Sequence, residues 1–237
     1  MMQSGKLFLL PCFIGDEETS STLSNWEIDL VNTIKLFITE NEKSCRRFMR
    51  KAGFQGNFDE LELIRLDKNS SPEEINHIIN LLNAGNDAAL ISEAGAPALA
   101  DPGAPLIRIA HKHDIDIIPV PGPSAIMQAI VSSGLNGQQF IFHGYLPIDS
   151  SKRKAALRDL ENKSSKDGYA HFFIETPYRN NALLQDLLEV LSGNTYLSIA
   201  ANINSDQAFI RTKPVKLWKV NIPDLHKKPA VFGLICN

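Results

Sequence analysis

The stretch ISEAGAPALADPG, residues 91–103, begins at the end of an apolar run that starts at residue 88, and a helical pattern follows it at residues 105–111. A loop between a strand and a helix usually has about two to six residues, so this one is long. Its small residues let a ligand approach the backbone, and open α/β sheets bind ligands at the carboxyl ends of their strands. The stretch therefore indicates a ligand-binding loop in an α/β fold, with an ordinary connecting loop as the alternative.

The chain around this loop alternates short apolar runs with helical patterns. Ser71, Pro72 and Glu74 predict a helix start, because a serine cap, an early proline and first-turn acids suit a helix N-terminus. The predicted strands lie at residues 7–10, 34–39, 61–66, 88–91 and 115–120. The predicted helices lie at residues 26–32, 44–52, 72–84 and 105–111. Apolar strands that alternate with helices predict a mostly parallel sheet covered on both faces.

The second half of the chain changes character after residue 121. Helices are predicted at residues 124–133, 151–162 and 179–191, and strands at residues 140–145 and 169–175. Four β-like runs then follow one another without helices, at residues 196–201, 208–212, 215–220 and 230–236. Consecutive strands predict an antiparallel or mixed sheet. We therefore expect two α/β domains, residues 1–121 and residues 122–237.

Composition limits the classes of function. Hydrophobic residues make up 43% of the 237-residue chain, enough for a full core. The formal net charge of −3 gives no overall support to nucleic-acid binding by charge, although a local basic patch stays open. No stretch approaches the roughly 20 apolar residues of a membrane span, and no signal peptide pattern is present, so we expect a cytoplasmic protein without a membrane partner. The three cysteines form no C-x-x-C pair, and we expect neither a disulfide framework nor a metal site.

Two further segments lie at predicted strand ends. PVPGPSA at residues 119–125 ends a strand and starts a helix abruptly, either as part of a ligand site or as a rigid interdomain hinge. ETPYR at residues 175–179 places Glu175 and Arg179 close to another strand end. The Arg179 guanidinium suits a phosphate or carboxylate of a substrate, with a surface salt bridge as the alternative.

Together these motifs resemble those of the tetrapyrrole methylases. SEAGAP at residues 92–97 with DPG at residues 101–103 is similar to the family's S-D-A-G-x-P…S-D-P-G loop, and residues 119–125 resemble its P-x-P-G-P-S-A element. ETPYR at residues 175–179 and FHGYLP at residues 142–147 resemble the E-S-P-H-R and F-x-G-F-L-P elements of one branch, the bacterial 16S ribosomal RNA ribose 2′-O-methyltransferases. Four motifs in the family's order are specific. The pattern G-x-G-x-x-G is absent, which ranks an NAD-type oxidoreductase low.

The resemblance implies a fold, a cofactor and an assembly. The fold has an N-terminal, mostly parallel α/β domain and a C-terminal mixed-sheet α/β domain, with S-adenosylmethionine bound in a cleft between them. The assembly is a homodimer. By position in the motifs, the residues that the resemblance places near the cofactor are Pro11, Glu93, Ala94, Gly95, Ala98, Ser124, Ala125, Glu175, Ala200, Ala201 and Ala230.

Three elements of the ribosomal branch are altered, and all lie on the side expected to meet the substrate. PCFIGDE at residues 11–17 stands where the branch has T-P-I-G-N-L, and ITENEK at residues 38–43 stands where it has A-E-D-T-R. LDKN at residues 66–69 replaces an expected H-E-x-N. The resemblance therefore supports cofactor binding more strongly than it identifies the methyl acceptor.

Candidate catalytic and substrate-binding residues lie in the altered region. Methyl transfer from a sulfonium needs no metal, and an oxygen acceptor benefits from a general base. Glu40, at the end of a predicted strand, is the candidate base, with a solvated acid on the next helix as the alternative. Arg179 is the candidate contact to a substrate anion. The basic residues on one face of the following helix, which either meet an RNA backbone or face solvent, are Lys43, Arg46, Arg47 and Arg50.

Three functions fit these observations. The leading hypothesis is an S-adenosylmethionine-dependent methyltransferase acting on a ribose of ribosomal RNA, with the RNA or the small ribosomal subunit as its partner. The second is a methyltransferase for a tetrapyrrole or another small acceptor, which a crowded apolar cleft with few basic residues would favour. The third is a cofactor-binding protein that has lost catalysis, which would bind the cofactor without turnover.

Overall fold

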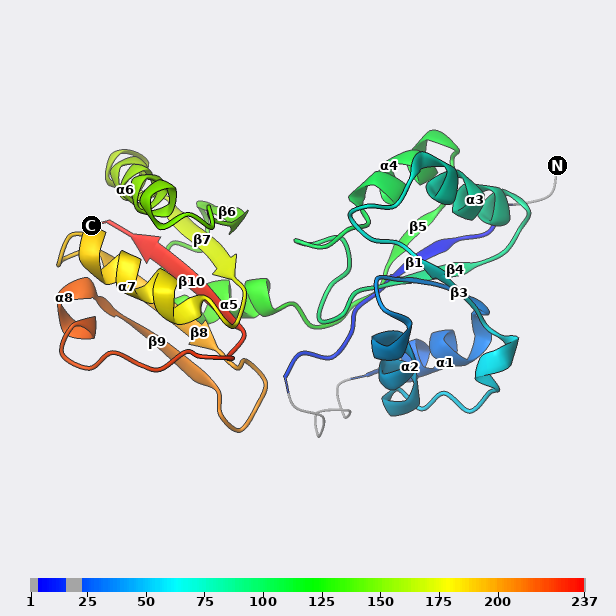
Figure 1. The fold of residues 1–237 in the computed structure, drawn as a ribbon. Helices are drawn as coiled ribbons and strands as arrows, with labels where there is room; N and C mark the ends of the chain where they lie inside the picture. Colours follow the sequence, from blue (N-terminus) through cyan, green and yellow to red (C-terminus); the bar gives the residue numbers. More distant parts are fainter. Residues whose placement is uncertain (1–3, 16–22, 237) are drawn as a thin grey trace. The chain divides into compact units, whose positions relative to one another are not determined.

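The computed structural model describes residues 4–15 and 23–236 (Figure 1). The chain divides into two compact units, unit 1 (Met1–Ser124) and unit 2 (Ala125–Asn237). The last two positions of the altered loop at residues 11–17, Asp16 and Glu17, lie outside the described residues.

Unit 1 is built on a sheet of five strands in which the pairings are all parallel, which confirms the predicted parallel α/β architecture. Its strands are β1 (Leu7–Leu10), β2 (Leu36–Thr39), β3 (Glu62–Arg65), β4 (Ala88–Ile91) and β5 (Ile117–Pro119). The order across the sheet is β3-β2-β4-β1-β5 (Figure 1). β2 and β4 are buried along their whole length. The apolar runs of the sequence therefore form the centre of this sheet.

Helices cover both faces of this sheet. They are α1 (Asn25–Thr33), α2 (Glu42–Lys51), α3 (Pro72–Asn83) and α4 (Ala104–Lys112), with the short 3-10 helix η2 (Phe58–Glu60). α1 and α2 pack on one face around Phe37 and Met49, whereas α3 and α4 pack on the other around Ile78 and Leu90 (Figure 1). β4 therefore leads to a helix on one face, while its neighbours β1 and β2 lead to helices on the opposite face. In an open α/β sheet, such diverging loops mark the place where ligands bind.

Local sequence explains where these helices begin, and α3 is the clearest case. The Ser71 hydroxyl accepts a 3.2 Å hydrogen bond from the Glu74 backbone N–H, and the Glu74 carboxylate accepts one of 2.6 Å from the Ser71 N–H. Pro72 occupies the first turn, where its missing N–H leaves no donor unpaired. The predicted helix start is confirmed.

Unit 2 has a mixed sheet in the order β6-β7-β10-β8-β9, as the consecutive strands predicted. Its strands are β6 (Phe140–Tyr145), β7 (Ala170–Glu175), β8 (Tyr196–Ala201), β9 (Phe209–Pro214) and β10 (Ala230–Ile235). β6 and β7 run parallel, and the other described pairings are antiparallel. One face of the sheet packs against α5 (Ala125–Ser133). The other face packs against α6 (Ser150–Asp167), α7 (Asn180–Val190) and α8 (Val215–Trp218).

The prediction of a strand at residues 215–220 is wrong, because this segment opens with the short helix α8. Trp218 is buried, and its indole N–H donates a 3.0 Å hydrogen bond to the Leu197 carbonyl of β8. Burying this large side chain turns the backbone away from β9 after Pro214. Tertiary packing therefore overrides the local β propensity of this segment.

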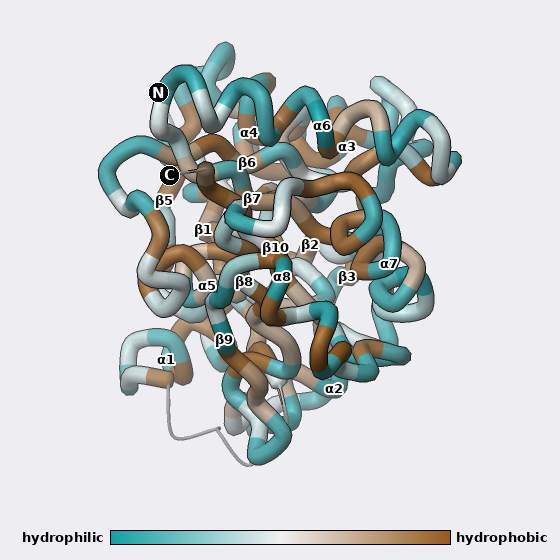
Figure 2. The backbone as a smooth tube through the Cα atoms, turned by 90° about the vertical axis from the view of Figure 1, so that its left-hand side faces the viewer, coloured by the Kyte–Doolittle hydropathy of each residue, from teal (hydrophilic) through white to brown (hydrophobic). Residues whose placement is uncertain are grey.

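Hydrophobic residues concentrate along the strands of both sheets, and hydrophilic stretches lie mainly on the surrounding helices and loops (Figure 2). Within the described ranges, the helices lack the length and apolar composition that crossing a bilayer requires.

Gly233, in the middle of β10, is required for close packing in unit 2. A Cβ at this position would lie 2.5 Å from Phe172 Cε1 and 3.1 Å from Leu135 Cδ1, and Phe172 is itself buried. We therefore expect Gly233→Ala to lower the free energy of unfolding by about 1–3 kcal/mol in urea titrations. Gly137→Ala is the matched control, because nothing lies within 4 Å of its Cβ position. A Gly233→Ala protein as stable as this control would contradict the packing described.

Candidate functional site

The carboxyl ends of β1, β4 and β5 bring three loops of unit 1 together. Cys12 and Gly95 exchange two backbone hydrogen bonds of 2.9 and 3.1 Å, which join the loop after β1 to the loop after β4. A Cβ on Gly122 would lie 2.7 Å from the Cβ of Pro11. A Cβ on Gly95 would lie 3.5 Å from the Pro123 carbonyl oxygen. The structure therefore places the predicted residues Pro11 and Gly95 against the PVPGPSA segment, where a side chain on Gly122 would clash with Pro11.

The loop after β4 has an unusual backbone. Ala98 and Ala100 have φ angles of 63° and 64°, in the left-handed region that costs a residue with a side chain about 1–2 kcal/mol. Gly103 has a φ of 147°, which residues other than glycine rarely adopt. The buried Ser92 hydroxyl donates a 2.7 Å hydrogen bond to the Gly95 carbonyl and helps to fix the loop. Backbone held in such conformations by its surroundings is typical of ligand-binding sites.

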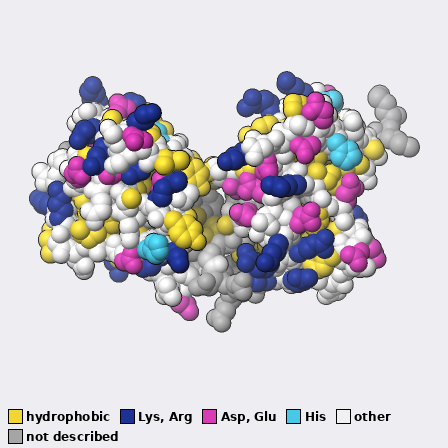
Figure 3. Space-filling view, viewed as in Figure 1, with side chains coloured by type: hydrophobic (Ala, Val, Ile, Leu, Met, Phe, Trp, Pro, Cys, Tyr) yellow, Lys and Arg dark blue, Asp and Glu magenta, His cyan; other side chains and the backbone are white. Residues whose placement is uncertain are grey.

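Three carboxyl groups interact at this end of the sheet, and Figure 3 shows Asp and Glu side chains close together on this part of unit 1. Glu40 directly follows β2, whereas Glu93 and Asp101 lie on the loop after β4. Burial raises the pKa of Glu40 to about 7, and repulsion from Asp101, Glu93 and Asp67 adds to the rise. Burial and the charge of Glu93 raise the pKa of Asp101 to about 6. Carboxyl groups with a pKa near neutrality can take up or release a proton during a reaction.

Glu40 differs from the solvated helix acid that was its alternative interpretation. α2 begins at Glu42, and Asn41 caps it by accepting hydrogen bonds from the backbone N–H groups of Lys43 and Ser44. Glu40 therefore lies before the helix, half-buried at the strand end. In the described part of the chain, no group of three or more His, Cys, Asp and Glu side chains is arranged to hold a metal ion.

Unit 2 gathers its predicted residues at one end of its own sheet. Ala230, the first residue of β10, pairs with Glu175 at the end of β7 on one side and with Ala201 at the end of β8 on the other. Ala200 points to the opposite face, where it packs in the same hydrophobic cluster as Ala125 of α5. The structure therefore brings Glu175, Ala201 and Ala230 into one row and separates Ala200 and Ala125 from it.

Glu175 and Arg179 bind each other. Glu175 Oε1 accepts hydrogen bonds of 2.6 Å from Arg179 Nη2 and from the backbone N–H of Thr176. The Glu175 side chain is 1% exposed and the Arg179 side chain 37% exposed. Among the described residues, Glu175 Oε2 and Arg179 Nε have no hydrogen-bond partner although both atoms are buried. A buried carboxylate oxygen without a donor is costly, so Oε2 has the capacity for a further hydrogen bond.

The other predicted residues vary in exposure. Glu93 and Ala94 are exposed, whereas Ala98 and Ser124 are half-buried. No role for Asp101 followed from the sequence, although this residue lies in the DPG part of the long loop. Its place in that motif could have marked Asp101 as a site residue. Its effect on the pKa of Glu40 was not visible in the sequence, because it depends on β2 and β4 being neighbours in the sheet.

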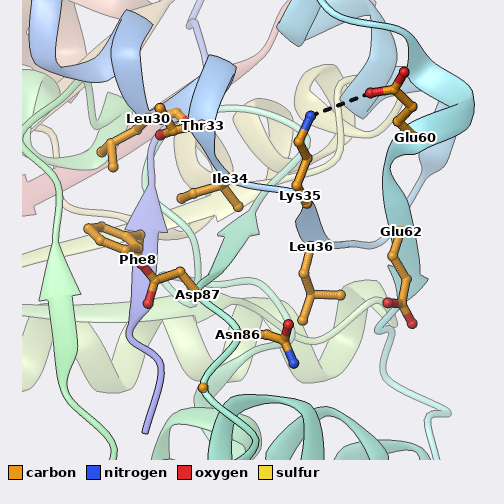
Figure 4. A pocket seen from close by; sticks show the side chains of 11 residues that line it. Phe8, Leu30, Thr33, Ile34, Lys35, Leu36, Glu60, Glu62, Asn86 and Asp87 are labelled. Atoms are coloured by element: carbon orange, nitrogen blue, oxygen red, sulfur yellow. Dashed lines mark hydrogen bonds and ion pairs between the residues drawn. The ribbon is translucent and has the colours of Figure 1, made fainter. Parts of the chain in front are cut away.

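A pocket of about 410 Å³ lies at the opposite, amino-terminal edge of the unit 1 sheet (Figure 4). Its polar groups already have partners, since Lys35 pairs with Glu60 at 3.7 Å and Asp87 accepts a 2.7 Å hydrogen bond from the Lys6 backbone N–H. Ligands of open α/β sheets bind at the carboxyl ends of strands. We therefore place the candidate site at the acidic strand ends and not in this pocket.

Comparisons with known proteins agree with one another. The sequence profile of the family described as Tetrapyrrole (Corrin/Porphyrin) Methylases matches residues 30–214. Ribosomal RNA small subunit methyltransferase I of Buchnera aphidicola subsp. Schizaphis graminum is 30% identical over 236 residues, which cover 98% of this chain and 79% of that protein. The protein of the same name from Thermotoga maritima is 34% identical over 210 residues, 88% of either chain.

The fold is also similar to that of a solved enzyme. The X-ray structure of cobalt precorrin-4 methyltransferase, a cobalamin biosynthetic enzyme, aligns with a TM-score of 0.60 and 13% sequence identity. The alignment covers 97% of this chain and 94% of that one. This likeness establishes the two-domain α/β fold.

The raised pKa of Glu40 predicts a pH-dependent stability difference. The folded protein holds this proton up to about pH 7, whereas an unfolded glutamate loses it near its ordinary value of 4.5, so the free energy of unfolding falls as pH rises between these values. We expect Glu40→Gln to be more stable than the parent protein by about 1–2 kcal/mol near pH 8, after discounting for solvent screening, and the difference to vanish near pH 4. Thermal or urea unfolding at both pH values measures it.

Asp206→Asn is the control for this measurement, because Asp206 is exposed on a loop of unit 2. This variant should differ from the parent by a similar small amount at both pH values. A Glu40→Gln protein with no stability gain at the higher pH would show that Glu40 is an ordinary surface acid.

Proposed function

Because the chain belongs to the tetrapyrrole methylase family and is an S-adenosylmethionine-dependent methyltransferase, we propose that it methylates a ribose hydroxyl of small-subunit ribosomal RNA. The observation that carries this proposal is similarity over nearly the whole chain. Relatives named ribosomal RNA small subunit methyltransferase I are 30% and 34% identical to it, whereas the precorrin methyltransferase is 13% identical. The ETPYR and FHGYLP motifs favour the same branch.

The residues present suit S-adenosylmethionine, which is positively charged and supplies an electrophilic methyl group when bound. Glu175 Oε2, buried and without a donor in the described part of the chain, suits an N–H or O–H of such a ligand. In unit 1, Gly95 and Gly122 allow the loops that carry the predicted residues to pack closely, because a side chain on either glycine would meet Ile14 or Pro11. The carboxyl groups of Glu40 and Asp101 favour a nearby positive charge. The remaining residues that we propose for the cofactor are Pro11, Glu93, Ala94, Ala98, Ser124, Ala201 and Ala230, together with Ala125 and Ala200 on the opposite face of the unit 2 sheet.

Glu40 is the proposed general base. With a pKa of about 7, Glu40 is ionised in a large fraction of the protein molecules at neutral pH. The carboxylate can then accept the proton of the ribose hydroxyl. A solvated carboxylate with an ordinary pKa would be a much weaker base. Asp101 and Glu93 act through Glu40, because their charges help to hold its pKa up. Arg179 is a positioning residue for Glu175 in this proposal.

A small acceptor is the second candidate function. Two observations support it. The elements at residues 38–43 and 66–69 replace motifs of the ribosomal branch, and the acidic strand ends repel phosphate. The same alterations support a cofactor-binding protein without catalysis. The resemblance to the family further supports a homodimer that works in the cytoplasm, and sedimentation equilibrium would detect the dimer.

Transfer of a labelled methyl group from S-adenosylmethionine to small ribosomal subunits tests the proposed function. The subunits should be assembled from RNA transcribed in vitro, so that every natural methylation site is open. We expect label in ribose-methylated nucleosides after nuclease digestion. Label in a tetrapyrrole but not in RNA would favour the second function. Cofactor binding by calorimetry without transfer to either acceptor would indicate lost catalysis.

Glu40→Gln should lower kcat by about 10²–10⁴-fold, because it removes the proton acceptor while keeping the shape of the side chain. The Kd for S-adenosylmethionine should change far less. In the parent protein, kcat/KM should rise with pH around a midpoint of about 7, because this ratio reports the free protein and the ionised form of Glu40 is the active one. A flat pH profile, or full activity in Glu40→Gln, would rule out this role.

Glu175→Gln should weaken S-adenosylmethionine binding by roughly 10–100-fold, because hydrogen bonds to a charged group contribute about 1.5–3 kcal/mol. Isothermal titration calorimetry measures the Kd, and a melting curve checks that the protein remains folded. Glu189→Gln is the matched control, since Glu189 is an exposed acid of α7 that pairs with Lys154. Unchanged affinity in a folded Glu175→Gln protein would remove Glu175 from the proposed cofactor site.

A further inference from the structure

α2 carries a basic face that no described acid neutralises. Lys43, Arg46, Arg47 and Arg50 occupy helical positions i, i+3, i+4 and i+7 and therefore lie on one side of the helix. Within residues 4–15 and 23–236, no carboxylate forms an ion pair with these four side chains. The opposite side of α2 is buried and consists of Cys45, Phe48 and Met49. Positive charge is thus concentrated on one surface of a chain whose net charge is −3.

The other helix rich in basic residues, α6, is different. Arg153 and Lys154 both pair with Asp186 of α7, and Lys154 also pairs with Glu189. Lys163 pairs with Asp159 within α6 itself. The pairs of Arg153 and Lys154 tie α6 to α7, whereas Lys152 and Arg158 of α6 form no ion pair with a described residue. No ion pair of this kind ties the four side chains of α2 to the described part of unit 1.

An aromatic side chain supports two of the guanidinium groups. Arg50 Cζ lies 5.0 Å and Arg46 Cζ 5.4 Å from the centre of the Phe58 ring of η2. Phe54 packs against Phe58 with ring centres 4.8 Å apart and steadies it. A guanidinium held over a ring loses conformational freedom, while its N–H donors that point away from the ring remain available. Planar, preoriented donors of this kind recognise phosphate oxygens well.

The basic face is connected to the candidate site. α2 begins two residues after Glu40, and the Ser44 hydroxyl in its first turn donates a 3.3 Å hydrogen bond to Glu93 Oε1. A helix of ten residues is about 15 Å long. The basic side of α2 therefore extends from the strand end over a distance that covers more than one backbone phosphate. Figure 3 shows Lys and Arg side chains gathered over α2 on the visible surface of unit 1.

We propose that this α2 basic face, formed by Lys43, Arg46, Arg47 and Arg50, binds the phosphate backbone of the RNA substrate beside Glu40. The inference rests on the proposed function and adds the surface that holds the polyanion. Stacked guanidinium groups and unpaired charge match a phosphodiester backbone, whose negative charges lie along a line. The face also offsets the repulsion between RNA and the acidic strand ends, because it lies next to them.

The test compares two double variants that lose the same charge. Lys43→Gln/Arg47→Gln removes two exposed residues of the face that do not stack on Phe58, so folding should be retained. Lys152→Gln/Arg158→Gln removes two exposed residues of α6 and is the matched control. Filter binding to small-subunit ribosomal RNA transcribed in vitro is measured over a range of salt concentrations. The Kd for S-adenosylmethionine is measured on the same preparations.

We expect the α2 variant to bind RNA about tenfold more weakly, with a salt slope reduced by about 1.4–1.8, and to bind S-adenosylmethionine normally. The α6 variant should match the parent in both measurements. Equal weakening by both variants would overturn the proposal, because only overall charge would then matter. An unaffected α2 variant, while the parent protein binds and methylates RNA, would overturn the basic face and leave the proposed function standing. A parent protein that binds S-adenosylmethionine but no RNA would overturn both.

Discussion

Burial of carboxyl groups at the strand ends of unit 1, together with the repulsion between them, sets the electrostatics of the candidate site. Glu40, Glu93 and Asp101 come from two loops, and they meet because β2 and β4 are neighbours in a parallel sheet. Parallel strands all end at the same edge, and the helices after β2 and β4 leave on opposite faces, so the acids gather at this edge, where Glu40 and Asp101 are half-buried. A carboxyl group with a pKa near neutrality follows from this arrangement.

Such a site lowers the free energy of unfolding, and burial of hydrophobic side chains in the core of each unit offsets this loss. The loop after β4 holds Ala98 and Ala100 in left-handed conformations, and the raised pKa of Glu40 means that ionisation at neutral pH opposes folding. Unit 2 shows the same principle, because Oε2 of Glu175 is buried there without a hydrogen-bond partner among the described residues. Groups that are unfavourable in the protein alone become favourable when a ligand supplies the missing charge or hydrogen bond. Their occurrence in both units at predicted residues supports the proposed cofactor site.

Much of this fold was predictable from the sequence. The apolar runs at residues 88–91, 140–145 and 196–201 coincide with β4, β6 and β8, because strand periodicity and buried runs are local signals. α8 was not predictable, because its conformation is decided by the burial of Trp218 against β8. The candidate loops were found through their glycines, prolines and small residues. The raised pKa of Glu40, the role of Asp101 and the pairing of Glu175 with Arg179 depend on strand order and side-chain packing, which the sequence does not state.

Burial and acidic neighbours hold Glu40 as a proton acceptor near neutral pH. ¹³C NMR of glutamate side-chain carboxyl carbons measures this property, and Glu40→Gln identifies the resonance of Glu40 as the one that disappears. We expect this resonance to titrate with a midpoint of about 7, far above the ordinary value of 4.5. A Glu40 resonance that titrates near 4.5 would show that the strand ends hold an ordinary solvated carboxylate.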